Sequence, residues 1–261
     1  MVAMAIAAGA RVADSPSLLW SRNGEISRQA AEILQALRSA DAYGLRPADY
    51  DGPALASRAA DLVRARDTDS MHWAEFDRAL SDATGRFLTH LHFGRVQPRV
   101  AGFDLPQPRP ALDTAALLAR LAQTNDVNAI LSTVEPQFHH YRLLQQWLGR
   151  YRALAGDPAL TNLPAVAGRS PGPGDRYSGA AALRKLLVTL GDLSAVDAAT
   201  ADATLDPALV EAIRRFQQRH GLDADGIIGK RTFTALTTPL AQRVRQIELT
   251  LELLTSAATA A

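Results

Sequence analysis

The most constraining feature of this chain is one stretch, residues 208–236, in which two helices and the turn between them can be read. Its first half repeats apolar or aromatic side chains at the three- and four-residue spacing of one helix face. These side chains are Leu209, Ile213, Phe216 and His220. Asp206 is a ready N-cap, Pro207 suits the first helical position, and Gly221 favours a stop. The sequence therefore predicts an amphipathic helix over residues 207–220.

The second half of the stretch turns the chain and begins another helix. Asp225-Gly226 favours a tight turn, and the two isoleucines that follow supply a short hydrophobic step. Gly229 opens the next helix, and Pro239 ends it. The inner positions of this helix are Thr232, Phe233 and Leu236. A loop of fixed geometry therefore joins two helices.

This combination resembles the peptidoglycan-binding domain of the three-helix type, because the pattern spans both helices and the turn chemistry between them. The matching residues are Phe216, Gln217, Gly221, Leu222, Asp225, Gly226, Gly229, Thr232 and Leu236. The resemblance covers residues 170–239 and implies a first helix over residues 179–190, with Gly191 after it. The apolar stripe of that helix is Leu183, Leu186, Leu187 and Leu190. A module over residues 175–240 is expected.

The resemblance implies a ligand groove at the turn and the start of the second helix. Two interpretations of the turn stay open: its residues hold special backbone angles, or its free amides receive a stem-peptide carboxylate. We expect Gly229→Val both to crowd the ligand and to strain the turn. Basic side chains could add charge, although charges on a helix are usually only solvated. The candidate binding residues are Asp225, Gly226, Ile228, Gly229, Lys230, Arg231, Thr232, Arg215 and Arg219.

The composition narrows the class of protein. With 261 residues and 47% hydrophobic content, the chain can bury one large core or two modest ones. A net charge of +1 gives no basic field, so neither nucleic acid nor an anionic membrane surface is expected as a partner. Cysteine is absent, which excludes disulfides, thiolate nucleophiles and cysteine-ligated metals.

Residues 1–19 begin with a run of small apolar residues that is too short to span a bilayer and lacks the positive start of a full signal peptide. They are interpreted either as a disordered terminus or as the remnant of a signal peptide. A remnant would agree with a periplasmic or cell-envelope location. No transmembrane segment is expected.

The first half of the chain shows helical periodicity throughout and no strand alternation of useful length. A helix begins after Ser27, a second follows Asp51, and the strongest stripe runs from Trp73 to Leu91. Shorter helices are expected around residues 117–121 and 127–131, and a long one that ends at Gly156. The predicted fold class is therefore all-α, a helical scaffold domain followed by the small three-helix domain.

Three segments of this half, residues 44–50, 86–98 and 140–144, resemble the helical scaffold domain of one class of exported bacterial L,D-transpeptidases. The implied layout is a scaffold domain over residues 20–156, a Pro/Gly-rich linker over 157–174, and a helix and tail over 241–261 that lead towards a missing domain. In that family a cysteine in a Ser-His-Gly-Cys context catalyses cross-linking. Since no cysteine is present, the chain is expected to be inactive alone, with a catalytic domain in the same or another chain.

The histidines do not indicate a catalytic or metal site. His90 and His92 are two apart, and His139 and His140 are adjacent, spacings that point side chains in different directions on a helix. No Gly-x-Ser-x-Gly elbow is present, although a triad assembled from distant residues stays open. No metal and no cofactor is expected.

The sequence leaves two alternative functions of different classes. The first is a noncatalytic peptidoglycan-binding and scaffold region of an L,D-transpeptidase-like protein, with the stem peptide or the glycan of peptidoglycan as its partner. The second is a helical protein-interaction adaptor that keeps the fold but binds no peptidoglycan.

Overall fold

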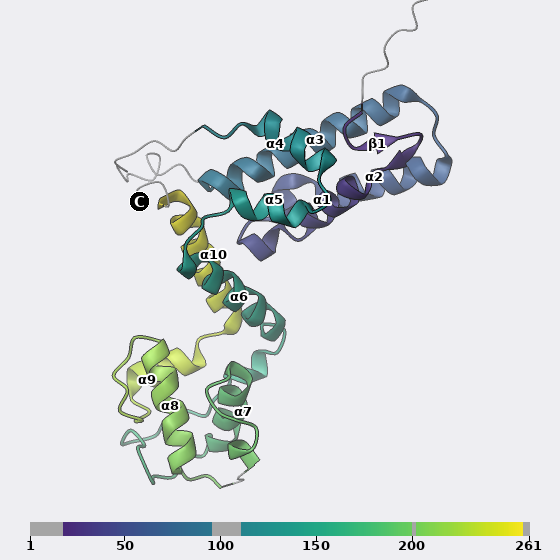
Figure 1. The fold of residues 1–261 in the computed structure, drawn as a ribbon. Helices are drawn as coiled ribbons and strands as arrows, with labels where there is room; N and C mark the ends of the chain where they lie inside the picture. Colours follow the sequence, from purple (N-terminus) through teal and green to yellow (C-terminus); the bar gives the residue numbers. More distant parts are fainter. Residues whose placement is uncertain (1–17, 96–110, 200–201, 258–261) are drawn as a thin grey trace, which may run out of the picture. The chain divides into compact units, whose positions relative to one another are not determined.

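A computed structural model describes residues 18–95, 111–199 and 202–257 of the chain. The chain forms two compact units (Figure 1). One takes the chain up to Gln145 and again from Glu248 onward, and the other is Gln146–Ile247. Ten α-helices and one very short hairpin make up the regular structure of the described residues, and the predicted all-α fold is confirmed.

The first unit is a helical bundle built around its longest helix. Its elements are β1 (Ser21–Arg22), β2 (Glu25–Ile26), α1 (Arg28–Arg38), η1 (Ala40–Tyr43), η2 (Pro47–Tyr50), α2 (Gly52–Ala65), α3 (Ser70–Phe93), α4 (Thr114–Gln123), α5 (Val127–Val134) and the start of α6 (His139–Leu154). Helix α3 contacts α1, α2, α4 and α5. Its inner face carries Phe76, Leu80, Phe87, Leu88 and Leu91, all buried, so the strongest apolar stripe of the sequence lies at the centre of this core.

Side-chain caps explain where several of these helices begin. Ser27 accepts a hydrogen bond from the amide of Ala30, and Asp69 accepts one from Met71, so α1 and α3 each start at a capping residue. Glycine does not end α1 itself. The helix ends at Arg38, η1 follows, and Gly44 then adopts a φ of 76°.

The hairpin β1–β2 was not expected from the sequence. Asn23 and Gly24 both have positive φ, 55° and 75°, as the tight turn between two antiparallel strands requires. The chain just before it is anchored to α3, because Trp20 is fully buried and its indole nitrogen donates to Ser81 Oγ at 2.8 Å. Strands of two residues carry no alternation that a sequence pattern could reveal.

The second unit contains the predicted three-helix module. Its helices are α7 (Ala180–Leu190), α8 (Pro207–Arg219) and α9 (Lys230–Thr237), with η3 (Pro158–Thr161), η4 (Asp197–Ala199), the end of α6 and the start of α10 (Leu240–Ala257). Asp206 caps α8 by accepting from the Leu209 amide at 2.8 Å, and Gly191 ends α7 with a φ of 84°. The observed bounds lie within one residue of the predicted helices over 179–190 and 207–220.

The segment predicted to be a linker, residues 157–174, belongs instead to the second unit. Leu160 and Leu163 are buried in its core, and the Tyr177 hydroxyl donates to the Pro164 carbonyl at 2.6 Å. The Pro171 carbonyl accepts from the Ile228 amide at 2.9 Å. The proline and glycine content suggested a spacer, but the leucines between them supply apolar surface that is removed from water by packing. The predicted boundary at residue 156 also differs, since the unit begins at Gln146 within α6.

A C-terminal helix and tail were expected over residues 241–261, leading towards a missing domain. The helix extends over Leu240–Ala257, and its inner face already has partners. Val244 and Ile247 pack on the core of the second unit, while Leu251 is buried in the first unit. The Arg95 amide also donates to Glu252 of α10. The proposed signal-peptide remnant falls largely on residues 1–17, which lie outside the described residues, as do residues 96–98 of one scaffold motif.

Candidate functional site

The turn between α8 and α9 is organised by one buried side chain, Gln217, which is 1% exposed. Its Oε1 accepts from the Gly226 amide at 2.8 Å. Its Nε2 lies 2.8 Å from Asp225 Oδ1, 3.0 Å from the Ile227 carbonyl and 3.1 Å from Thr232 Oγ1. A buried amide with all these partners is satisfied, and it fixes the loop against α8.

Four predicted site residues thus have clear roles in holding the turn. Asp225 also accepts from the Ile227 amide at 2.8 Å, and Ile228 and Thr232 are buried. Gly226 has a φ of 78°, and a Cβ there would lie 2.7 Å from Cγ1 of Val210. These contacts support the structural interpretation of these four residues, in which they hold the backbone angles of the turn.

Gly229 departs from the expectation. It is the N-cap of α9 with a φ of −74° and a ψ of 175°, which any residue adopts, and a Cβ there would meet no atom within 4 Å. The expectation that a side chain would strain the turn is therefore wrong. No side chain caps this helix start. The space beside the Gly229 Cα is open.

Arg215 and Arg219 lie apart from the turn residues and bind the end of α7. Arg215 Nε donates to the Asp192 carbonyl at 2.9 Å, and Arg219 pairs with the buried Asp192 carboxylate. The Arg219 guanidinium also donates to the Tyr151 hydroxyl and lies 5.0 Å from the centre of the Trp147 ring. These two predicted ligand-binding arginines therefore hold the second unit together.

The two remaining predicted cations, Lys230 and Arg231, border a pocket of about 410 Å³. The described residues that line it are His220, Leu222, Lys230, Arg231, Thr234, Ala235, Thr238 and Arg243. Three of these side chains are cationic, and no carboxylate is among them. Leu222 and Ala235 contribute apolar surface. Such a pocket can accept an anionic group next to an apolar one.

Arg243 was missed by sequence reasoning. It lies on α10, beyond the proline that was interpreted as the end of the module, and its guanidinium donates to the Ala235 carbonyl at 3.2 Å and to Gln246 Oε1 at 3.1 Å. Burial and the charge of Arg219 lower the pKa of Arg243. The half-buried position strengthens its attraction for an anion relative to an exposed lysine.

His220, predicted to lie on the apolar face of α8, also borders the pocket. Its ring lies 4.1 Å from that of Phe216, and its Nε2 is buried with no hydrogen-bond partner. Burial, together with the charges of Arg219 and Arg243, lowers the pKa of His220 to about 4. The imidazole is therefore neutral at pH 7, and the positive charge of the pocket comes from lysine and arginine alone.

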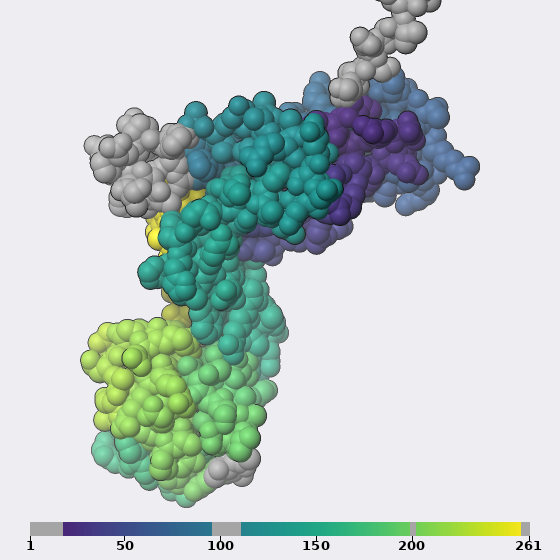
Figure 2. Space-filling view, viewed as in Figure 1, coloured from purple at the N-terminus to yellow at the C-terminus, as the bar shows by residue number. Residues whose placement is uncertain are grey.

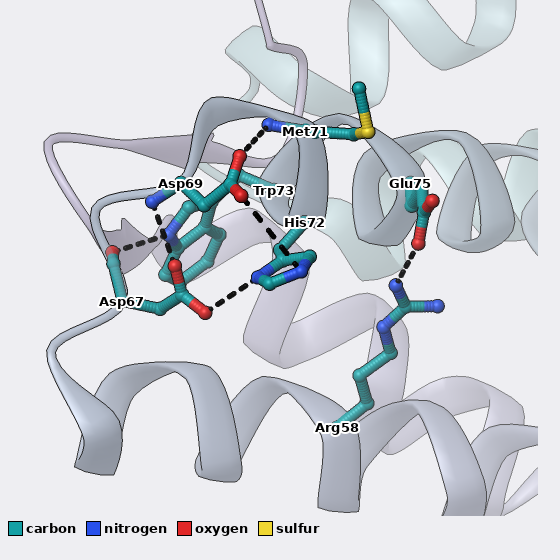
Figure 3. Close-up of polar contacts among 7 residues, drawn as sticks. All are labelled: Arg58, Asp67, Asp69, Met71, His72, Trp73 and Glu75. Atoms are coloured by element: carbon teal, nitrogen blue, oxygen red, sulfur yellow. Dashed lines mark hydrogen bonds and ion pairs between the residues drawn. The ribbon is translucent and has the colours of Figure 1, made fainter.

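The histidine with the clearest acidic partners is His72, at the start of α3 (Figure 3). Its Nδ1 lies 2.8 Å from Asp67 Oδ2, and the hydrogen bond and charge of Asp67 raise the pKa of His72. The Asp67 carboxylate also accepts from the Asp69 amide at 2.7 Å, so the cluster ties the turn before α3 together. Within the described ranges, no serine or threonine hydroxyl hydrogen-bonds to His72, and no group of three His, Asp or Glu side chains could hold a metal.

A family model described as "Scaffold domain" matches residues 13–148, more than half of the chain. The chain belongs to the scaffold-domain family. The match ends within α6, close to the boundary of the first unit. No helix in the part of this scaffold-domain protein that the structure describes is both long and apolar enough for a membrane span.

A second family model, described as "Putative peptidoglycan binding domain", matches residues 176–236. This segment contains all of α7 and α8 and nearly all of α9, so the match supports peptidoglycan binding by the second unit. Thr238 and Arg243 lie just beyond it. No curated protein matches the chain.

Proposed function

We propose that the chain is the noncatalytic peptidoglycan-binding and scaffold region of an L,D-transpeptidase-like protein of the cell envelope. The observation that carries the proposal is the convergence of Lys230, Arg231 and Arg243 on one pocket, where none of the lining residues that the structure describes is acidic. The peptidoglycan-binding family match includes the first two of these residues. In this proposal the pocket receives a carboxylate of the stem peptide.

The chemistry of the pocket agrees with that ligand. A stem peptide presents carboxylates beside short aliphatic side chains, and the pocket places cations beside Leu222 and Ala235. An arginine can bind a carboxylate through two parallel hydrogen bonds, whereas a lysine acts as a point charge. Arg243 is half-buried, so we assign it the largest share of the affinity. Lys230 and Arg231 are exposed and contribute less, about 0.2–1 kcal/mol each.

The link to cross-linking rests on the order of the two matched domains, a scaffold domain followed by a peptidoglycan-binding one. Cross-linking by L,D-transpeptidases requires a cysteine thiolate, and the sequence contains no cysteine. We therefore assign this chain to substrate retention and positioning, with cross-linking performed by a catalytic domain in the same or another chain. Peptidoglycan as a ligand implies a periplasmic or cell-envelope location.

Retention on purified sacculi tests the binding function. Arg243→Gln should reduce the fraction retained by about five-fold or more at low ionic strength, because it removes the partly desolvated cation. Arg245→Gln is the matched control, since Arg245 is exposed on the same helix and does not line the pocket. Circular dichroism and thermal melting establish that both variants are folded.

Three outcomes are informative. A selective loss with Arg243→Gln supports the pocket as the peptidoglycan site. Equal retention of wild type and both variants removes the pocket from the binding surface. Absence of retention for the folded wild-type chain contradicts peptidoglycan binding altogether and leaves the adaptor interpretation.

A further inference from the structure

The pocket bordered by Lys230, Arg231 and Arg243 carries positive charge that no carboxylate balances. Lys230 and Arg231 make no ion pair or side-chain hydrogen bond with any residue that the structure describes. The Arg243 guanidinium donates to two uncharged acceptors, the Ala235 carbonyl and Gln246 Oε1. In Figure 2 the light green atoms of α9 lie at the surface of the second unit, where a ligand can reach them.

The acidic groups of the same unit that lie near in sequence are committed elsewhere. Asp192 pairs with Arg219, and Glu211 pairs with Arg214. The Asp225 carboxylate accepts from the Ile227 amide and from Gln217. None of these three carboxylates is in the lining of the pocket. The second unit therefore pairs several of its charges but leaves those of the pocket without counter-charge.

The pKa of His220 gives an independent indication of the sign of the potential in the pocket. Burial lowers this pKa, and so do the charges of Arg219 and Arg243, which are both positive. A site that disfavours the protonated imidazole also disfavours any other cation placed beside it. The pocket is therefore expected to attract an anion and to repel an ammonium group.

We propose that this pocket selects a carboxylate whose neighbouring nitrogen is acylated, as at the C-terminus of a peptide, and rejects a carboxylate that has an ammonium group beside it. The inference rests on the proposed function, because it specifies which carboxylate of the stem peptide is bound. An ammonium group one carbon away would offset the attraction and would find no acid to pair with. Rejection through an unpaired charge is a common source of specificity.

Two small ligands that differ at one nitrogen test the inference. Nα,Nε-diacetyl-lysine and Nε-acetyl-lysine share their carboxylate and side chain, but only the second has an ammonium group beside the carboxylate. The readout is the backbone ¹H–¹⁵N signals of Thr234 and Ala235 in the full chain at low ionic strength. Diacetyl-lysine should bind about five-fold more tightly or better, and its uncharged carboxamide should bind as weakly as Nε-acetyl-lysine. The indole signal of Trp73, in the other unit, should not respond.

A matched pair of variants separates charge from shape. Thr234 is exposed on α9, and the hydrogen bonds that it accepts go to its backbone carbonyl, so its side chain can be replaced. Thr234→Glu adds a carboxylate to the lining, whereas Thr234→Gln adds a side chain of the same length without charge. The preference for diacetyl-lysine should fall to about two-fold or less in Thr234→Glu and persist in Thr234→Gln. Thermal melting establishes that both variants are folded.

Equal affinity for the two ligands would overturn the inference, and so would a preference that persists in Thr234→Glu. Absence of any shift at Thr234 and Ala235 with diacetyl-lysine would also overturn it. Sacculus retention decides the proposed function separately. Retention that depends on Arg243 would preserve the peptidoglycan site even without the ligand preference, and retention independent of Arg243 would contradict that site even with it.

Discussion

Leu251 packs directly on Gly44: a Cβ added to the glycine would lie 3.0 Å from Leu251 Cδ1 and 3.1 Å from Leu251 Cβ. Gly44 follows η1, and Leu251 is on α10, more than two hundred residues later. The positive φ of Gly44 and this close contact both require glycine. The contact packs the last part of α10 against the first unit, to which residues from Glu248 onward belong.

The first prediction concerns that contact. Leu251→Ala should destabilise the first unit by about 2–5 kcal/mol, because it opens a cavity at a side chain that is 1% exposed. Leu249→Ala, at 64% exposure two residues earlier, should change stability by less than ~0.5 kcal/mol. Urea unfolding measures both, and equal effects would mean that α10 is not packed as described.

The second prediction concerns Gln217. Gln217→Ala should cost about 2–4 kcal/mol, since it leaves the buried Gly226 amide without an acceptor and releases the loop. Gln218→Ala, on the exposed side of the same helix, is the control and should be nearly neutral. Amide exchange at Gly226 should become faster only in the Gln217 variant, and slow exchange there would show that another group holds the turn.

The third prediction contrasts two glycines of one loop. Gly226→Ala should destabilise the second unit by about 1–3 kcal/mol, because it strains a positive φ and meets Val210. Gly229→Ser should be neutral or stabilising by a few tenths of a kcal/mol, since serine caps a helix that has no side-chain cap. Thermal melting compares the two. A large loss of stability in Gly229→Ser would show that the fold requires glycine at this position.

The fourth prediction concerns pH. Because the pKa of His220 is lowered from 6.5 to about 4 in the folded state, the unfolded chain binds more protons between these values. Stability is complete above about pH 6.5 and falls as the pH decreases towards 4. Since the ring is only partly buried, the loss is on the order of 1–2 kcal/mol.

Guanidinium unfolding at pH 7.5 and pH 4.5 measures this loss in wild type and in His220→Phe, which keeps an aromatic ring but does not titrate. The pH dependence should be smaller in the variant. An unchanged dependence would assign the loss to other groups.

The fifth prediction concerns reactivity. Since the sequence has no cysteine, the chain should form no cross-links from tetrapeptide muropeptides and no covalent adduct with a carbapenem. Intact-mass measurement after incubation checks this, with a cysteine-dependent L,D-transpeptidase domain as a positive control. A mass increase equal to one carbapenem would reveal an unexpected nucleophile.

The helices and the turn of the second unit were predictable from sequence because their determinants are local. Asp206, Pro207 and Gly221 mark the ends of α8 through capping and backbone preferences that act within a few residues. The Asp225-Gly226 turn is equally local. The long apolar stripe of α3 likewise predicted a central helix, since a face of that kind must be buried.

Only the tertiary structure decided which polar side chains meet. Arg219 and Lys230 are both basic residues near the turn, yet Arg219 is committed to Asp192 at the end of α7, whereas Lys230 borders the pocket. Arg243 joins that pocket from beyond Pro239, and residues 157–174 pack instead of linking. Sequence periodicity determines which face of a helix is buried, but the partner of a charge depends on how separate helices pack, and that information is spread over the whole chain.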